Sequence, residues 1–349
     1  MLIDAEGRRV DLSDEENGHI LVWGKSGFGK TYFLCRQMEE YIRRGKKVLL
    51  IDYSGSYEQQ ELEKQKFTQN VKLYNPKKQT AEWKFNVESD FILQKDVVEA
   101  IIQILSIGSY FQAKLLEEAI DNILKYKTYI CIPDILREIE KMLVSEKWGD
   151  GLADNVNNLE RLLTKLQPYK NLEGIVISGM ILEQKENVDN TTILQFSDFS
   201  DHQRRFLTEL YLSLLWKETF RQSGKPSFDV VILDEFQNLS VKNGSTLASM
   251  LREGRKKGLD VVLGTQFISN YGKEEIQTLQ QVANCIIFQT APKDLKFSAE
   301  IIDLENTLKW KNVLKNLRKG EAVVSGTYTM EKRTKTMKTP IIVSIEKEE

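Results

Sequence analysis

The pattern of apolar and polar residues along the chain predicts strands and helices that alternate. Short apolar runs suited to buried strands occupy residues 19–23 and 47–52, and a segment with apolar residues at helical spacing, 30–44, separates them. Strand, helix and strand in this order form a βαβ unit, in which the two strands are parallel. The sequence therefore predicts an α/β fold with a mostly parallel central sheet.

Residues 93–170 follow a different pattern. Apolar residues recur there at helical spacing over several segments, and no strand signal interrupts them. We predict an all-helical insertion at 93–170, whose leucine and isoleucine stripes form a core of its own. The insertion divides the α/β core into a first part, 1–92, and a second part, 171–349. Within the first part, the polar residues 1–18 are enough for one edge strand or a lead-in and no more.

The second part of the core returns to alternating strands and helices. Helices are expected at 201–221 and from about Ser245 onward. Strands are expected at 174–178, 191–196, 230–233, 259–266, 284–289 and 321–325.

A glycine-rich stretch between the first strand and the first helix is the main candidate for chemistry. It has the spacing G-x-x-x-x-G-K-[ST] and consists of Gly24, Lys25, Ser26, Gly27, Phe28, Gly29, Lys30 and Thr31. Glycines let the backbone turn its N–H groups toward an anion, and the helix N-terminus adds partial positive charge. In such a loop, Lys30 reaches the β and γ phosphates and the Thr31 hydroxyl ligates Mg²⁺. We therefore expect binding of a nucleoside triphosphate, taken as ATP, with Mg²⁺.

Polar residues at the ends of other predicted strands suit the same chemistry. Asp234 and Glu235 follow four apolar residues, and on a strand they would point to opposite faces. Asp234 is predicted to order the metal and Glu235 to polarise the attacking water. Gln266 is either a sensor of the γ-phosphate or a partner in a hydrogen bond at the strand end. Asp52 either lies near the nucleotide or caps a turn.

Two clusters of basic residues have two interpretations each. The first, ahead of Gln266, is a solvated helix face or contains an arginine that stabilises transition-state charge, often in a neighbouring subunit. We assign that role to Arg255, with Arg252 as the alternative. The second cluster is a solvated face or a contact with DNA or another subunit. The first comprises Arg252, Arg255, Lys256 and Lys257, and the second Lys332, Arg333, Lys335 and Lys338.

Composition narrows the class of protein. With 349 residues, 41% hydrophobic and 29% charged, the chain is typical of a globular protein. Three scattered cysteines and two histidines argue against a disulfide framework or a zinc site. No apolar stretch is long enough to span a bilayer, so we expect a cytoplasmic protein without a membrane segment. The net charge of −2 means that DNA binding would require a local basic surface.

The motifs together resemble the HerA–FtsK superfamily of motor ATPases, which includes HerA-like and conjugative coupling-type enzymes. The resemblance rests on residues 24–31, on 230–235, and above all on Arg252-Glu253-Gly254-Arg255-Lys256 ahead of Thr265-Gln266. The segment 52–57 also resembles the family, although the acid expected at position 56 is absent. The helical segment is similar to the all-helical domain inserted in many relatives.

This resemblance implies a RecA-like P-loop NTPase in a ring, with a hexamer as the expected homo-oligomer, ATP sites between subunits and double-stranded DNA pumped through the channel. Residues 1–18 leave no room for the N-terminal β-barrel or the membrane helices of some relatives, so a motor domain nearly alone is expected.

Two functions stay open. One is a DNA translocase for transfer, processing or packaging. The other is a nucleotide-dependent oligomeric partner that activates an effector such as a nuclease or relaxase, for example in a defence system. A signalling NTPase is a third interpretation, but it does not explain the arginine-rich stretch.

Overall fold

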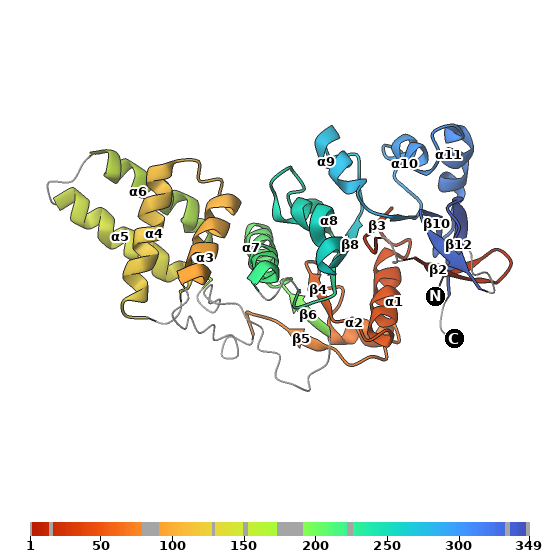
Figure 1. Ribbon diagram of the computed structural model, residues 1–349, viewed down its shortest axis with the longest axis horizontal. Coiled ribbons are helices and arrows are strands. Elements are labelled where there is room, and N and C mark those ends of the chain that lie inside the picture. Colours follow the sequence, from red (N-terminus) through yellow and green to blue (C-terminus); the bar gives the residue numbers. More distant parts are fainter. Residues whose placement is uncertain are drawn as a thin grey trace. The chain divides into compact units, whose positions relative to one another are not determined.

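The computed structural model describes residues 2–13, 17–78, 91–127, 130–148, 153–172, 191–221, 226–331 and 336–346 (Figure 1). The chain divides into two compact units. The first unit comprises Met1–Leu73, Asp189–Gln195 and Gln222–Glu349, and the second comprises Tyr74–Val188 and Phe196–Arg221.

One mixed sheet organises the first unit. Among the described residues its strand order is β11-β2-β1-β12-β10-β9-β3-β8-β7-β4-β6-β5. The consecutive strands from β9 to β6 are parallel, and the strands from β10 to β11 pair antiparallel. This confirms the predicted α/β fold with a mostly parallel sheet. The strands are β1 Leu2–Asp4, β2 Arg9–Leu12, β3 Ile20–Trp23, β4 Val48–Asp52, β5 Lys72–Tyr74, β6 Thr191–Gln195, β7 Val230–Leu233, β8 Asp260–Thr265, β9 Asn284–Ile287, β10 Glu321–Ser325, β11 Tyr328–Met330 and β12 Ile341–Ile345.

The register of the parallel strands brings their carboxyl ends to one edge. Trp23 at the end of β3 lies opposite both Thr265 of β8 and Ile287 of β9. Leu233 of β7 lies opposite Ile51 of β4. Loops that follow these strands therefore meet at the same edge of the sheet, which is where ligands bind in open α/β sheets.

Helices of the first unit cover the sheet. Phe33, Leu34 and Met38 of the first helix pack with Val22 and Ile232 in one apolar core. All five are buried. The four-residue spacing of Leu34 and Met38 places both on one face of the helix, and that face packs on the sheet. The helices of this unit are α1 Lys30–Arg43, α2 Gln59–Lys64, α8 Thr246–Lys257, α9 Lys273–Leu279, α10 Leu295–Ile302 and α11 Thr307–Asn316.

The N-terminal residues form two strands, so the expectation of one edge strand at most was wrong. The turn between β1 and β2 is closed by the Asp4 carboxylate, whose Oδ1 accepts from the backbone N–H of Glu6 at 2.9 Å and of Arg8 at 2.8 Å. Gly7 has φ +77°, a conformation that favours glycine. β1 then pairs antiparallel with β12, near the other end of the sequence.

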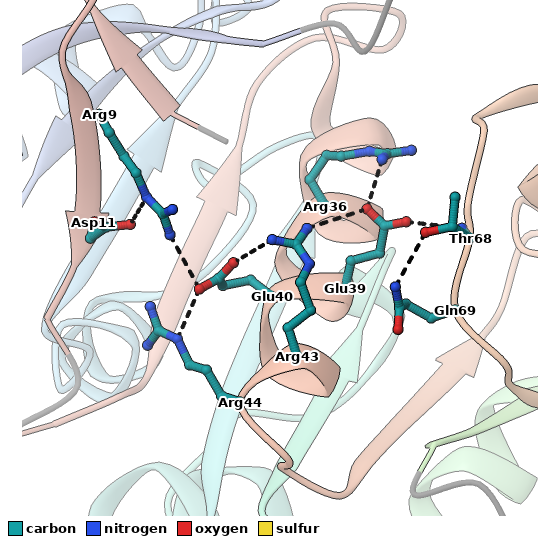
Figure 2. Close-up of polar contacts among 9 residues, drawn as sticks. All are labelled: Arg9, Asp11, Arg36, Glu39, Glu40, Arg43, Arg44, Thr68 and Gln69. Atoms are coloured by element: carbon teal, nitrogen blue, oxygen red, sulfur yellow. Dashed lines mark hydrogen bonds and ion pairs between the residues drawn. The ribbon is translucent and has the colours of Figure 1, made fainter.

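An ion-pair network fastens α1 to this hairpin (Figure 2). The Glu40 carboxylate is its centre and accepts from Arg9 at 3.3 Å, Arg43 at 2.9 Å and Arg44 at 3.0 Å. Arg9 of β2 also donates to Asp11 at 2.6 Å. Because Arg9 contacts acids of both elements, it holds the hairpin against the helix.

The same helix carries a buried ion pair on its other side (Figure 2). Arg36 donates to Glu39 at 2.7 Å, and the two side chains are only 5% and 1% exposed. Glu39 accepts in addition from the backbone N–H of Thr68 at 3.1 Å, and Arg36 donates to the Gln65 carbonyl. These bonds tie α1 to the chain that follows α2.

The second unit is helical in its described residues. Ile120, Ile135, Ile139, Leu159 and Leu162 are fully buried and belong to helices that pack on one another. This agrees with leucine and isoleucine stripes forming a core of their own. The elements are α3 Phe91–Ile104, α4 Tyr110–Leu124, α5 Ile132–Trp148, α6 Ala153–Leu166, a 3-10 turn Gln167–Tyr169 and α7 Asp201–Arg221.

Helix α7 belongs to this helical unit, whereas the sequence had placed it in the second part of the α/β core. Lys217 of α7 pairs with Asp96 of α3 at 3.5 Å. Phe206 of α7 stacks on Tyr169, with ring centroids 4.3 Å apart. The helical unit is therefore assembled from two stretches of sequence, and the boundaries at 92 and 170 stay a prediction. The strand predicted at 174–178 lies outside the described residues.

In the described part of the chain, no helix combines the length and the apolar character needed to cross a membrane.

Candidate nucleotide site

The glycine-rich loop joins β3 to α1, as the sequence predicted. Gly24 begins the loop with φ +149°, and a Cβ there would lie 2.6 Å from the Phe288 Cβ, too close for any side chain. The backbone N–H of Lys25 donates to the Gln289 carbonyl at 2.7 Å. The loop is therefore held against the chain that follows β9, and only glycine fits at its first position.

Lys30 and Thr31 occupy the first turn of α1. The Lys30 ammonium donates to the carbonyls of Gly24 at 2.9 Å and Lys25 at 3.1 Å, which places it inside the loop. Burial lowers the pKa of Lys30, while the charges of Asp234 and Glu235 act in the opposite direction. A buried ammonium beside a helix N-terminus and backbone N–H groups is suited to polyphosphate.

Asp234 follows β7 and accepts hydrogen bonds from three other residues. Its Oδ2 accepts from the hydroxyls of Tyr57 at 2.9 Å and Thr31 at 3.1 Å, and its Oδ1 from the backbone N–H of Glu235 at 3.0 Å. Burial, and next the Glu235 charge, raise the pKa of Asp234 to about 6. A Cβ at Gly264 would lie 2.7 Å from Oδ1, so β8 leaves room for this carboxylate only because that residue is glycine.

Glu235 has a left-handed backbone, with φ 60° and ψ 38°. β7 ends before the acid pair, so the opposite orientation expected on a strand does not apply. Gln266 donates to its Oε1 at 2.9 Å, and Gln237 donates to its Oε2. Gln237 in turn accepts from the Thr265 hydroxyl at 2.8 Å. A residue other than glycine with positive φ has a strained backbone. At Glu235 this conformation turns the side chain toward the end of β8.

Asp52 caps a turn, the second of the two roles considered for it. Its Oδ1 accepts from the N–H groups of Ser54 at 3.2 Å, Gly55 at 2.8 Å and Ser56 at 3.2 Å. Its Oδ2 accepts from the N–H of Tyr57 at 3.0 Å. The turn delivers Tyr57 to the site, a residue to which the sequence analysis gave no role.

Arg252 and Arg255 lie on an exposed face of α8. The helix begins at a Ser245 cap, whose hydroxyl accepts from the N–H of Ala248 at 3.3 Å. Arg252 donates to Asn243 at 2.7 Å, so within the described residues its hydrogen bond goes to that side chain rather than to the acid pair. Both arginines are exposed, and a role in a neighbouring subunit's site stays a prediction.

The donor set fits Mg²⁺. The Thr31 hydroxyl and the Asp234 carboxylate are oxygen ligands or water-binding groups 3.1 Å apart, as this hard cation prefers. Among the described residues, no group of three or more His, Cys, Asp or Glu side chains is placed to hold a metal ion.

Two known protein families match parts of the chain. Residues 8–215 match the family of the Helicase HerA central domain. Residues 157–336 match the type IV secretion-system coupling protein DNA-binding domain. No curated protein matches the chain in sequence.

Solved structures show the same fold. VirB4 of Thermoanaerobacter pseudethanolicus is 16% identical, with a TM-score of 0.64 over 99% of this chain and 95% of that one. The plasmid coupling protein TrwB in complex with the ATP analogue ADPNP is 18% identical, with a TM-score of 0.69 over 96% of this chain and 87% of that one. The first family match covers more than half of the sequence and includes the glycine loop, and the second match includes the acid pair. The chain belongs to the HerA central-domain family, within the HerA–FtsK superfamily of P-loop ATPases.

Proposed function

We propose that the protein is a Mg²⁺-dependent ATPase whose hydrolysis drives movement along double-stranded DNA. The observation that carries the ATPase is a cluster at one sheet edge, in which Thr31, Asp234, Glu235 and Gln266 are joined by hydrogen bonds beside Lys30. Lys30 and Thr31 come from the first turn of α1, Asp234 and Glu235 from the end of β7, and Gln266 from the end of β8, so the fold itself assembles the site.

The residues divide the chemistry among them. The loop N–H groups of 24–29 and the Lys30 ammonium bind the phosphates, and Thr31 with Asp234 holds Mg²⁺, which neutralises phosphate charge when bound. Glu235 accepts the proton of the attacking water, while Gln266 orients its carboxylate and contacts the γ-phosphate. The structure of TrwB in complex with ADP and Mg²⁺ supports this choice of ligands.

The DNA part of the proposal is supported by a basic surface that the sequence analysis missed. Residues 306–320 contain five cations and no acid. Within the described residues none of the five forms an ion pair, and Lys309, Lys315, Arg318 and Lys319 are exposed. We call α11 and the four residues that follow it the α11 basic surface; its cations are Lys309, Lys311, Lys315, Arg318 and Lys319.

This surface is connected to the nucleotide loop. Gln289 donates to the carbonyls of Lys315 at 2.9 Å and Leu317 at 3.1 Å, and it accepts from the Lys25 ammonium at 3.0 Å. The backbone N–H of Gly320 donates to the Phe28 carbonyl at 3.0 Å. A phosphate backbone bound at α11 would therefore act on the loop through a few direct contacts. The match of residues 157–336 to a DNA-binding domain family includes this surface.

A steady-state ATPase assay with long duplex, short duplex and no DNA tests both parts of the proposal. DNA of any sequence should stimulate hydrolysis, more so when long. Glu235→Gln should keep ATP binding and lose hydrolysis by orders of magnitude. The Lys315→Ala/Lys319→Ala double variant should lose the stimulation of hydrolysis by DNA. The slope of log binding constant against log salt concentration should become shallower by up to about 2. The control is Lys64→Ala/Lys147→Ala, which removes the same charge elsewhere.

The outcomes separate the candidate functions. Unchanged turnover in Glu235→Gln would remove that residue from catalysis. A rate that stays flat with DNA at low salt, in a confirmed oligomer, would exclude the translocase. A rate that then responds to an added effector nuclease would identify the oligomeric partner instead.

A further inference from the structure

Tyr57 is fully buried, and its hydroxyl forms a hydrogen bond with Asp234 of the nucleotide site. The ring is 0% exposed, and the hydroxyl donates to Asp234 Oδ2 at 2.9 Å. The two residues follow neighbouring strands, β4 and β7, whose last paired residues are Ile51 and Leu233. The contact therefore joins two loops at the edge where the nucleotide site lies.

The choice of tyrosine at this position is informative. Phenylalanine would fill the same apolar space, and a buried hydroxyl is unfavourable unless it forms a hydrogen bond. The chain around it is fixed by the four backbone N–H bonds to Asp52 and by the Gln195 amide, which donates to the Tyr57 carbonyl at 3.5 Å. The structure thus holds one hydroxyl in one place.

The two hydroxyls that donate to Asp234 differ in whether they can also bind a metal. Thr31 donates its hydroxyl hydrogen to Oδ2 and keeps its lone pairs for a metal. Tyr57 donates to the same oxygen, and its ring is enclosed in the apolar core, so it takes no other part in the chemistry. Gly264 lies against the other oxygen of the carboxylate, Oδ1.

We infer that Tyr57 is the positioning residue for Asp234, holding the carboxylate in the orientation from which it binds Mg²⁺ with Thr31. This inference rests on the proposed function, because it assumes that nucleotide and Mg²⁺ bind here. Partners of metal ligands that set their orientation commonly change metal affinity by about 10–100-fold when removed. A purely structural hydroxyl would lower stability and leave metal affinity unchanged.

The test removes the hydroxyl alone. A fluorescent ATP analogue is titrated onto wild type and Tyr57→Phe in EDTA and then with increasing Mg²⁺, and bound Mn²⁺ is counted separately by electron paramagnetic resonance. Tyr57→Phe should bind the analogue normally in EDTA and require about 10-fold more Mg²⁺. Tyr328→Phe is the control, because Tyr328 is also a buried residue and its hydroxyl donates to the Thr339 carbonyl at 2.8 Å, away from the acid pair. It should keep the wild-type Mg²⁺ requirement whatever thermal stability it loses.

Equal Mg²⁺ requirements in all three proteins would overturn the inference. A wild-type protein that binds no nucleotide would instead overturn the proposed function. If Tyr57→Phe does not fold, Asp52→Asn takes its place, since it keeps the hydroxyl and weakens the turn that holds it. That variant should also need more Mg²⁺, and a wild-type requirement there would equally overturn the inference.

Discussion

Asp234 shows how one residue meets two opposing demands. Its carboxylate must be ionised to bind a metal, yet it lies in the core, where burial raises its pKa to about 6. The Tyr57 and Thr31 hydroxyls donate to it and act against this shift. The site therefore keeps a charged acid at neutral pH at some cost to the stability of the free protein.

We predict that Asp234→Asn stabilises the nucleotide-free protein at neutral pH. The folded-state pKa is raised from 3.8 to about 6, so between these values the folded protein holds a proton that the unfolded chain has released. Stability then falls as pH rises through this window, and the loss persists above it. In urea unfolding, the free energy of unfolding of Asp234→Asn should exceed that of the wild type by on the order of 2 kcal/mol at pH 7.5 and by little near pH 4.

The exposed Asp201 on α7 provides the control for this experiment. Asp201→Asn should change stability only slightly at either pH, as expected of an exposed surface group. An Asp234→Asn advantage of the same size at both pH values would mean that packing, and not ionisation, causes it.

At the scale of elements, α1 carries two adjacent acids with different stability roles. We predict that Glu39→Ala costs about 3–5 kcal/mol, because it leaves Arg36 charged and buried. Glu40→Ala should cost roughly 1 kcal/mol, because its three arginines are partly exposed to water. Chemical unfolding of both variants measures the difference. Equal costs would show that the Arg36–Glu39 pair is not isolated from solvent.

Elements with a local signal were the ones that the sequence could predict. The loop 24–29 follows a buried strand and precedes a helix, and Val230–Leu233 is apolar throughout, so their identity depends on neighbours in sequence. The β1–β2 hairpin was missed because its partner strand β12 lies near the other end of the chain. α7 groups with the helical unit, and the sequence did not indicate this because helical periodicity does not show which helix will cover it.

Within the site, the motif residues were predictable and their supporting contacts were not. Lys30, Thr31, Asp234, Glu235 and Gln266 come together as expected because parallel strands end at one edge. The roles of Tyr57 and Gln237 depend on hydrogen bonds between residues from separate loops, which no spacing reveals. The α11 cations had a signal in sequence, a run of 15 residues without an acid, and it was overlooked.

At the scale of the whole molecule, the site within one chain contains an acid pair and a lysine, and its proposed arginine lies on the exposed face of α8. α8 ends with Arg255, Lys256 and Lys257 and leads directly into β8, which carries the sensor position. An exposed arginine does little in its own site, but it can complete the site of a neighbour in a head-to-tail ring. Activity would then require assembly.

Mixing two inactive variants tests this arrangement. Lys30→Ala lacks phosphate binding but presents a normal Arg255, and Arg255→Ala has the reverse defect. In a ring of equal parts, about a quarter of the interfaces combine an intact loop with an intact arginine, so the mixture should recover activity that neither variant has alone.

Lys256→Ala, one residue along the same exposed face, should stay active by itself and serves as control. Repeating the mixture with Arg252→Ala distinguishes the two arginines, since only the residue that reaches the neighbouring site is complemented. A wild type that hydrolyses ATP as a monomer, with no recovery in the mixture, would give Arg255 another role.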